Sequence, residues 1–578
     1  TTVAICLAIN IIKMSKENAL VKKMIACETI GCINVICSDK TGTLTENRMT
    51  VQQVCERGVL KQPQDVADMD LLKNFSLNST ADIGIENNAY TFIGNPTECA
   101  LLVAADKAGK DYQQIRKSFG IAHVYPFSSD TKNMTTVVHG ENGYTVYTKG
   151  SPEKILSMCS LDAAEKQKYE EQITAFQEKA CRVIGFAHKN IDSCPDFETQ
   201  RDSIESDLVF DGFTAIADPL RKEVYDAVRS CRKAGIDVKM LTGDNIVTAT
   251  AIANDLSLLD ENHIALEAKD IDALNEKELS DLLPKIRVIA RSTPVIKMRV
   301  VKALKAMKCV VAVTGDGIND APAIKNADIG LAMGISGTEV SKEASDVVLL
   351  DDSFSTIVKA IQWGRGIYEN FQRFILFQLT VNLSSVVVVL VSLLAGFPTP
   401  FTALQLLWVN LIMDGPPALT LSLEPIRSTL MDNKPTPRNA SIVTKEMLAR
   451  IIFNGLFISA VFMLQTSQNI LGGTPEQNRT ILFTLFVMFQ LMNAFSCREL
   501  THESIFRHFF DNKLMLIAFI ATFLLQYVIS QYGGYVFGTV PLPAEMWLKI
   551  IGLSVTVIIA SEFFKVLMTI HQKLKNKK

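Results

Sequence analysis

The sequence lacks the paired cysteines and the excess of one charge that mark several common classes of protein. Its 12 cysteines include no C-x-x-C pair, which argues against a zinc ribbon or a dithiol redox site. Lysine and arginine number 58 against 61 acidic residues, so the net charge of −3 does not indicate a general nucleic-acid binder. Cys27, Cys32 and Cys37 follow a spacing that suits neither a metal site nor a disulfide ladder, and we interpret them as free thiols.

The chain also lacks a Walker A loop, G-x-x-x-x-G-K-[ST], and a recognisable secretory signal. Residues 1–12 are apolar but have no basic start and no cleavage site, and the first residue is not methionine. We therefore expect this run to be the end of a membrane helix, and the chain to be a fragment truncated at its N-terminus.

Long apolar segments are plentiful after Arg373, each near the ~20 residues that cross a bilayer. The six predicted spans are residues 374–396, 401–423, 451–471, 481–497, 514–536 and 546–568. The links between them alternate between nearly uncharged and basic, and the chain ends in KLKNKK. By the positive-inside rule the basic links and the tail face the cytoplasm. Six spans return the chain to its starting side, so residues 13–373 are expected in the cytoplasm and the lipid bilayer is an expected partner.

Four apolar runs in the earlier part each end in a polar cluster. INVIC precedes SDKTGT, DVKML precedes TGDN, CVVAV precedes TGDGINDAP, and ADIGLAM precedes GISGT; DVVLL is a possible fifth strand. Helix-like stretches at residues 222–235 and 295–307 lie between them. This alternation predicts a parallel sheet covered on both faces, with the polar clusters gathered at the carboxyl ends of its strands. Residues 51–209 differ in texture and are predicted to form an inserted domain.

Asp39 ends the first of these strands, where a carboxylate can act as a covalent nucleophile toward a phosphoryl group. Such an attack needs cations and hydrogen-bond donors nearby, and Asp316 could share Mg²⁺ with Asp39 while Lys297 neutralises charge. The groups that could donate to phosphate oxygens are Thr242, Gly243 and Asn319. Each signal alone is weak, since T-G-D is usually an ordinary turn, Lys297 could be a surface lysine and Asp39 could cap a helix. The order of the motifs along the chain carries the prediction.

These ordered motifs resemble those of the P-type ATPases, most closely the calcium pumps of the plasma-membrane type. The matching segments are DKTGT at 39–43, KGSPE at 149–153, DPLR at 218–221, TGD at 242–244 and TGDGIND at 314–320. The resemblance covers essentially the whole chain. It implies that Asp39 is phosphorylated, that Asp244 belongs to the same catalytic site, and that Mg²⁺ is held by Asp39, Asp316 and the backbone carbonyl of Thr41.

The resemblance also implies a fold and a location. We expect a haloacid-dehalogenase-like α/β phosphorylation domain, an inserted α+β nucleotide-binding domain and an all-α bundle of membrane helices, in the plasma membrane. The implied parts are 1–27 as a membrane-helix end and stalk, 28–50 with 210–360 as the phosphorylation domain, 51–209 as the nucleotide domain, and 361–578 as the membrane domain with six helices.

Thr41 departs from the related haloacid-dehalogenase phosphatases, which carry a second aspartate, the general acid and base, at this position. Without a carboxylate here, water is not readily activated against an aspartyl-phosphate. We therefore expect the intermediate on Asp39 to persist long enough to drive a conformational change.

ATP is placed in the inserted domain by the same resemblance. Phe127 would stack on adenine, and Lys149 would lie near the base and the phosphates; without the family, a core aromatic would be the better interpretation of Phe127. The other implied nucleotide contacts are Thr43, Glu98, Arg182, Asp218 and Arg221. Thr131 stands where relatives often have arginine, which puts that phosphate contact in question.

Asp414 lies in the middle of a predicted span, and a carboxylate inside a bilayer is by default a functional residue. The GPP sequence at 415–417 breaks the helix just after it and frees backbone carbonyls. Asn410 lies one turn before Asp414, and Asn382 is central in the preceding span. Together these residues offer hard oxygen ligands of the kind that suits Ca²⁺.

One Ca²⁺ site is implied when the resemblance is followed residue by residue. Two-site calcium pumps carry glutamate where this chain has Ser385 and Gln490, and threonine where it has Met413. The second site is therefore not expected, and the remaining ligands would be Asn382, Asn410 and Asp414, with one Ca²⁺ moved per ATP.

The actuator-domain T-G-E loop is absent from the sequence, so we expect this fragment to bind nucleotide without completing a transport cycle. Few residues follow the last predicted span, and no calmodulin-binding tail is expected. Three alternatives stay open: a pump for Mn²⁺ or a monovalent cation, a membrane-anchored phosphatase of the same superfamily, and a non-catalytic membrane protein. Thr41 argues against the phosphatase, and the full set of motifs argues against the non-catalytic protein.

Overall fold

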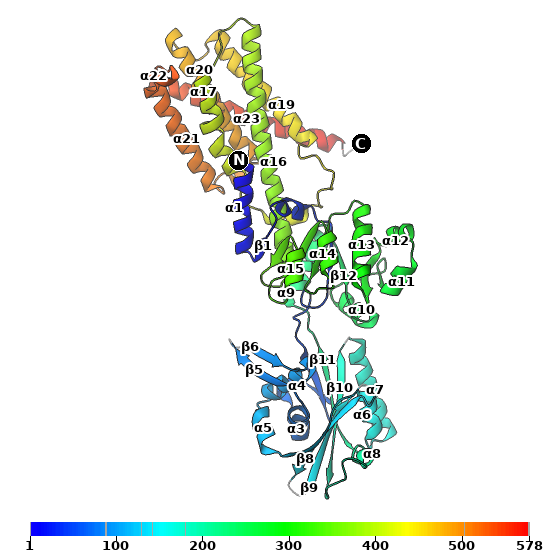
Figure 1. The fold of residues 1–578 in the computed structure, drawn as a ribbon. Coiled ribbons are helices and arrows are strands. Elements are labelled where there is room, and N and C mark those ends of the chain that lie inside the picture. Colours follow the sequence, from blue (N-terminus) through cyan, green and yellow to red (C-terminus); the bar gives the residue numbers. More distant parts are fainter. Residues whose placement is uncertain are drawn as a thin grey trace.

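The computed structural model of the chain describes residues 2–86, 89–128, 130–140, 143–179, 181–501 and 503–575. Three parts follow one another along its length: a bundle of long helices, a part built on an eight-stranded sheet, and a part built on a seven-stranded sheet (Figure 1). Residues 576–578 of the basic KLKNKK tail lie outside the described residues.

The eight-stranded sheet is parallel except for β1, which pairs antiparallel with β17 at one edge. In spatial order its strands are β1 (Ala19–Val21), β17 (Val347–Leu349), β16 (Ile329–Met333), β15 (Val311–Gly315), β2 (Val35–Ser38), β12 (Asp237–Leu241), β14 (Ile286–Ala290) and β13 (Ile264–Glu267). The five strands predicted from the apolar runs are confirmed. β1, β13 and β14 were not selected from the sequence. β1 and β13 are short and lack a clear apolar pattern, whereas β14 is a largely buried apolar run, IRVIA, that was overlooked.

Helices cover both faces of this sheet, as the alternating pattern predicted. Alternate residues of β2 face opposite sides: Val35 and Cys37 pack with α13 (Pro294–Ala306), and Ile36 packs on the other face with α9 (Lys222–Lys233). The other helices of this part are α2 (Ala26–Thr29), α10 (Ile246–Asp255), α11 (Ala268–Ala273), α12 (Glu276–Leu282), α14 (Ala321–Asn326) and α15 (Glu339–Ala344).

The seven-stranded sheet is antiparallel. In spatial order its strands are β4 (Val59–Lys61), β3 (Thr50–Glu56), β11 (Val209–Ala217), β10 (Arg182–Ile191), β9 (Gly143–Gly150), β8 (Asn133–Gly140) and β7 (Ile121–Tyr125). β11 continues past residue 209, so the sheet itself extends beyond the predicted range 51–209. Around it lie α3 (Met69–Leu77), α4 (Pro96–Lys107), α5 (Tyr112–Ser118), α6 (Pro152–Met158), α7 (Ala163–Glu178), α8 (Arg201–Ile204) and the hairpin of β5 (Asp82–Glu86) and β6 (Ala89–Ile93).

Within the described residues, five helices are long and apolar enough to cross a membrane. They are α16 (Phe354–Leu394), α19 (Lys445–Gln468), α20 (Pro475–Cys497), α21 (Lys513–Tyr532) and α23 (Ala544–Lys575). The apolar stretch of α20 is wholly buried, which places this helix at the centre of the bundle. Two further helices are α1 (Thr2–Lys16), formed by the N-terminal apolar run and its basic end, and the short α22 (Gly534–Phe537).

The second of the six predicted spans, 401–423, is interrupted near Asp414, where the GPP sequence predicts a break. This segment is divided into α17 (Ala403–Trp408), a π-helical turn (Val409–Met413) and α18 (Gly415–Leu421). The reason is local chemistry, since Pro416 and Pro417 have no N–H to donate and so cannot complete a regular helix through Asp414. The bundle therefore has five continuous long helices and one interrupted segment among the described residues.

A single helix joins the eight-stranded sheet to the bundle. α16 is 41 residues long, which corresponds to about 60 Å of helix. Its first turns pack under the sheet through Phe354 and Ile357, and its later turns pack in the bundle through Phe377 and Val381. The predicted span at 374–396 is thus the second half of a helix that begins in the cytoplasmic part.

Candidate active site

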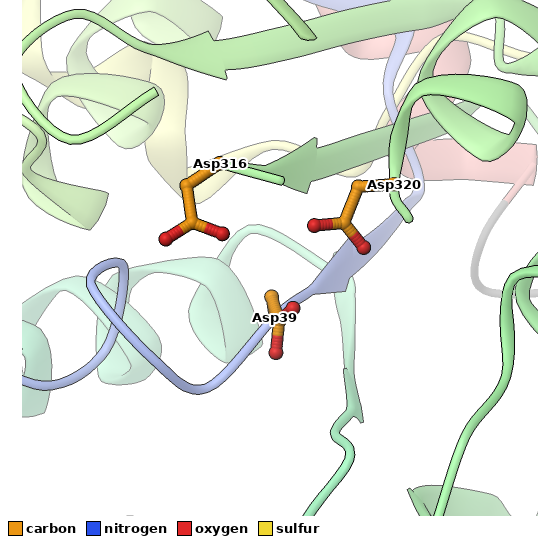
Figure 2. Close-up of side chains that lie close together, drawn as sticks. All are labelled: Asp39, Asp316 and Asp320. Carbon is orange, nitrogen blue, oxygen red and sulfur yellow. The ribbon is translucent and has the colours of Figure 1, made fainter. Parts of the chain in front are cut away.

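Three carboxylates meet at the carboxyl edge of the eight-stranded sheet (Figure 2). Asp39 directly follows β2, Asp316 directly follows β15, and Asp320 immediately precedes α14. One oxygen from each carboxylate lies within 4.8 Å of the others. β2 and β15 are neighbours in the parallel sheet, so their ends bring together residues 277 positions apart in the chain.

Lys297 joins two of these carboxylates. Its Nζ donates to Asp39 Oδ2 at 2.8 Å and to Asp320 Oδ1 at 2.6 Å, and its side chain is 8% exposed. The lysine comes from the first turn of α13, which begins with the Thr293 cap and Pro294. The surface-lysine alternative for Lys297 does not fit this position. Asp320 was not selected from the sequence, although it stands four residues after Asp316 in the same TGDGIND motif.

The charge balance of the cluster favours a bound cation. Burial raises the pKa of Asp39, although Lys297 acts against this effect. Burial raises the pKa of Asp316 to about 6, and the charge of Asp39 adds to it. Burial alone would lower the pKa of Lys297, but Asp39 and Asp320 outweigh it and raise that pKa overall. Three carboxylates share one ammonium here, and carboxylate oxygens at this spacing suit Mg²⁺.

The loop after Asp39 is held by hydrogen bonds from residues about 175 positions later in the chain. Thr45 donates its hydroxyl to Asp218 Oδ2 at 2.5 Å. Arg221 donates from Nε to the Thr45 carbonyl at 3.0 Å and from Nη2 to the Gly42 carbonyl at 3.3 Å. Asp218 and Arg221, expected on the hinge side of the nucleotide site, hold the loop that follows Asp39, and Asp218 also lines the cleft that contains Lys40. Thr43 is fully buried, and its hydroxyl has no partner within the described part of the chain.

The TGD cluster lies beside this loop. Asp244 forms an ion pair with Lys40 at 2.8 Å, so the residue after Asp39 is tied to the end of β12. Thr242 is buried, and its hydroxyl accepts the N–H of Asp244 at 3.1 Å. Gly243 is exposed, and a Cβ there would meet nothing within 4 Å among the described residues. Asn319 is also exposed, so its amide remains open to a ligand.

A pocket of about 690 Å³ in the seven-stranded part brings together four residues predicted at the nucleotide. They are Glu98, Phe127, Lys149 and Arg182. Phe127 is 63% exposed, so it is not a core aromatic. The pocket has the size and the mixed apolar and polar lining of a small-molecule site. Thr131 lies near it, and its hydroxyl is paired with that of Ser128 at 2.9 Å.

Two charges in this pocket are paired with each other. Lys149 Nζ donates to Glu98 Oε1 at 2.7 Å, and both side chains are largely buried. Burial lowers the pKa of Lys149 despite the partner. Burial alone would raise the pKa of Glu98, but Lys149 and Thr80 lower it overall. Arg182 donates to the Thr97 hydroxyl at 2.9 Å, and it also lines the larger cleft that contains Lys40 and Asp244.

Asp414 is buried in the helix bundle at 3% exposure. Gln378 donates to its Oδ2 at 3.4 Å, and its Oδ1 has no partner within the described residues. Asn382 and Asn410 are exposed on the bundle surface, and the structure does not pair either with Asp414. The regular spacing of one helical turn between Asn410 and Asp414 is altered by the π-helical turn between them. Gln378 was not selected from the sequence, although it is a polar residue inside an apolar span.

The positions that differ from two-site pumps have partners inside the bundle. Gln490 donates to the Ser384 hydroxyl at 2.9 Å, and Ser385 donates its hydroxyl to the Val381 carbonyl at 2.8 Å. Met413 is fully buried. These contacts fill the positions without adding a carboxylate beside Asp414.

Comparison with known proteins adds a family to this geometry. The family profile described as "P-type ATPase, cytoplasmic domain N" matches residues 69–223, and "Cation transporting ATPase, C-terminus" matches residues 398–567. Calcium-transporting ATPase 3, plasma membrane-type, of Oryza sativa subsp. japonica is 39% identical over 94% of this chain and 56% of its own length. Calcium-transporting ATPase PAT1 of Dictyostelium discoideum is 38% identical over 94% of this chain and 54% of its own.

Plasma membrane calcium-transporting ATPase 4 of Homo sapiens is 36% identical over 98% of this chain and 50% of its own length. This chain therefore spans about half the length of the curated relatives that it matches. The similarity extends over 94–98% of this chain, so it includes both sheets and the helix bundle. The chain belongs to the P-type ATPases, and the relatives that it resembles over almost its whole length are named as plasma-membrane calcium-transporting pumps.

Proposed function

We propose that this chain is the phosphorylating and ion-binding part of an ATP-driven pump that exports Ca²⁺ across the plasma membrane. The observation that carries the proposal is the Asp39 carboxylate, held at 2.8 Å by Lys297 and set beside Asp316 at the edge of a parallel sheet. A nucleophile, a neutralising cation and a metal-binding carboxylate thus occupy one site.

The proposed reaction is phosphoryl transfer from ATP to Asp39. The carboxylate oxygen of Asp39 attacks the γ-phosphorus and forms an O–P bond, while the bond to the β–γ bridging oxygen breaks and ADP leaves with its electron pair. Lys297 reduces the repulsion between Asp39 and the incoming phosphate. Asp39, Asp316 and the Thr41 carbonyl would hold Mg²⁺, which when bound neutralises the charge of the phosphate oxygens.

Thr41 gives the product its lifetime. The related phosphatases use an aspartate here as general acid and base, and threonine cannot take that proton at neutral pH. The aspartyl-phosphate on Asp39 is therefore expected to wait for a conformational step. The remaining donors to the phosphate are Thr242, Gly243 and Asn319, with Asp244 orienting Lys40.

We place ATP between the two cytoplasmic sheets. Phe127 would stack on adenine in the pocket of the seven-stranded part, with Glu98 and Lys149 on its wall. Arg182 lines both this pocket and the cleft that contains Lys40, so it would bind phosphate oxygens of an ATP molecule that extends from the pocket toward Asp39. Asp218 and Arg221 act here through the loop that carries Asp39, and Thr43 supplies a buried hydroxyl in the same loop.

For the transported ion we propose one Ca²⁺ bound by Asp414, with Asn382 and Asn410, both exposed in this structure, as the further ligands that the family resemblance implies. Asp414 supports this, because it is a buried carboxylate with one oxygen unpartnered within the described residues. Its neighbours in the broken segment, Pro416 and Pro417, leave backbone carbonyls without helical partners. The haloacid-dehalogenase-like fold, and the division into 28–50 with 210–360, 51–209 and 361–578, form part of the same proposal.

The test is acid-stable phosphoenzyme formed from γ-labelled ATP with the full-length gene product in membranes. Label that requires Ca²⁺ and disappears in Asp39→Asn would establish both the nucleophile and the ion. Label that requires Asp39 but ignores a Ca²⁺ chelator would keep the phosphorylation chemistry and assign another cation. ATP binding without label under either condition would contradict the proposed enzyme.

A further inference from the structure

A third loop borders the carboxylate cluster and has no part in the mechanism above. It consists of residues 334–338, GISGT, directly after β16, and we call it the GISGT loop. Because β16 lies beside β15 in the parallel sheet, the loops after β16, β15 and β2 lie at the same edge. Gly337 makes the path of the loop possible, since a Cβ there would lie 2.0 Å from the Met333 carbonyl oxygen.

The loop and the helix that follows it are attached to the backbone of Asp316. Thr338 donates its N–H to the Asp316 carbonyl at 2.8 Å. Ser341, in the first turn of α15, donates its hydroxyl to the same oxygen at 3.1 Å. Two hydrogen bonds therefore fix this segment against the residue that would hold Mg²⁺.

Asp352 fixes the middle of the loop. Its Oδ1 accepts the N–H of Ile335 at 2.9 Å, and its Oδ2 accepts the N–H of Ser336 at 2.8 Å. Asp352 is 3% exposed and has a φ of +52°, a left-handed conformation that is uncommon for residues other than glycine. A buried carboxylate that accepts two successive amides fixes the conformation of the loop at Ile335 and Ser336.

Ser336 lies at the catalytic loop with an unused hydroxyl. A Cβ built on Gly42 would lie 3.4 Å from Asp316 Oδ2 and 3.5 Å from Ser336 Oγ, so both groups border the same point of the DKTGT loop. The hydroxyl is buried and has no hydrogen-bond partner within the described part of the chain. Leaving a buried hydroxyl unpaired costs free energy, which favours a state in which a ligand supplies the partner.

We propose that Ser336 hydrogen-bonds a water molecule of the Mg²⁺ bound at Asp39 and Asp316, and that Asp352 is its positioning residue. This inference rests on the magnesium site of the proposed function. Mg²⁺ gives up its waters reluctantly and keeps several of them in protein sites, where the waters need partners of their own. A serine hydroxyl can donate to and accept from such a water.

The test is a Mn²⁺ titration of the purified full-length gene product in detergent without nucleotide, in which electron paramagnetic resonance measures the free Mn²⁺. Removing the hydroxyl in Ser336→Ala should weaken Mn²⁺ binding about 10-fold, the usual effect of losing an outer partner of a metal site. Ser336→Thr keeps a hydroxyl and should restore most of the affinity. Asp352→Asn keeps one acceptor oxygen for the two amides, and its Mn²⁺ affinity should lie between those of Ser336→Ala and Ser336→Thr.

Ser345→Ala is the matched control. Ser345 is also buried in the segment after β16, but its hydroxyl donates to the Lys342 carbonyl at 2.7 Å, within its own turn. This variant should bind Mn²⁺ like the wild type. If a thermal unfolding measurement shows that Ser336→Ala is not folded, Ser336→Gly removes the same hydroxyl and answers the same question.

Asp316→Asn separates the two proposals. If this variant loses Mn²⁺ while Ser336→Ala binds it within twofold of the wild type, the inference about Ser336 is wrong and the metal site stands. If the wild type itself binds no Mn²⁺, both the metal site and the inference are refuted. Weaker binding in Ser336→Ala with recovery in Ser336→Thr would support the inference, because a merely structural loss would not depend on the hydroxyl.

Discussion

Replacing Lys297 with methionine is the sharpest perturbation that the active site offers. Methionine keeps the length of the side chain but removes the ammonium that bonds Asp39 and Asp320. Three carboxylates with oxygens within 4.8 Å would then face one another without it. At an effective dielectric constant of about 20, two unit charges at this distance repel by about 3 kcal/mol.

That repulsion is relieved when one carboxyl stays protonated near neutral pH, because a buried like-charged pair cannot easily ionise twice. Burial already raises the pKa of Asp39, so Asp39 is one of the carboxyls that we expect to stay protonated. A protonated Asp39 cannot attack phosphorus. We expect the rate of phosphoenzyme formation in Lys297→Met to fall by about two orders of magnitude, the equivalent of about 3 kcal/mol.

The assay is rapid-quench phosphorylation with γ-labelled ATP over a series of pH values. Raising the pH should recover rate in Lys297→Met more steeply than in the wild type, because the cluster then ionises without the lysine. Lys302→Met, on the exposed side of the same helix, should leave the rate unchanged. A Lys297→Met enzyme that folds and phosphorylates at the wild-type rate, or is slow by the same factor at every pH, would refute this reasoning.

Four further outcomes are expected. Burial raises the pKa of Asp316 to about 6, so the ionised side chain destabilises the fold by an amount that grows above about pH 4 and is complete above about pH 6. Asp316→Asn should therefore raise the melting temperature at neutral pH, by the equivalent of about 1–2 kcal/mol. This gain should shrink as the pH falls from about 6 to about 4 and in millimolar Mg²⁺, and a pH-independent gain would contradict the reasoning. Phe127→Ala should weaken binding of a fluorescent ATP analogue about 5- to 30-fold through lost stacking, with Phe127→Trp as control, and equal affinity would place adenine elsewhere. Asp414→Asn should abolish the Ca²⁺-dependent phosphoenzyme formed from ATP in membranes but leave nucleotide affinity unchanged. Retained Ca²⁺-dependent label would exclude Asp414 from the ion site. Thr41→Asp should shorten the lifetime of the phosphoenzyme in a chase experiment, with Thr41→Ser as control, and an unchanged decay rate would exclude Thr41 as its cause.

The carboxylate cluster was largely predictable from the sequence because parallel topology converts order into proximity. If the strands before Asp39 and Asp316 are parallel neighbours, their carboxyl ends lie at the same edge of the sheet, and so do the two aspartates. Five of the eight strands could be predicted as apolar runs. Asp320 was missed because its role is visible only from Lys297, which reaches it across from another helix. No pattern in one sequence indicates which carboxylate a distant lysine will select.

The hydrogen bonds that hold the loop after Asp39 could not be predicted from the sequence either. The DPLR motif was recognised, but the roles of Asp218 and Arg221 depend on where the chain returns from the seven-stranded sheet. The membrane site shows the same limit. Apolar length predicted each span, whereas the faces presented by Asn382 and Asn410 depend on helix rotation, and a π-helical turn before Asp414 alters the spacing on which a helical reading depends.

The distance between the two proposed sites is bridged by one close contact and one helix. Gly31 lies just before β2, whose end carries Asp39, and a Cβ on Gly31 would lie 2.4 Å from the backbone of Gly364 on α16. Gln378, the hydrogen-bond partner of Asp414, is 14 residues further along the same helix, about 21 Å. Packed backbones without side chains between them leave little room to absorb a shift. We therefore propose that a shift of β2 on phosphorylation of Asp39 moves α16, and with it Gln378 beside Asp414, through elements that the sequence presents as unrelated segments.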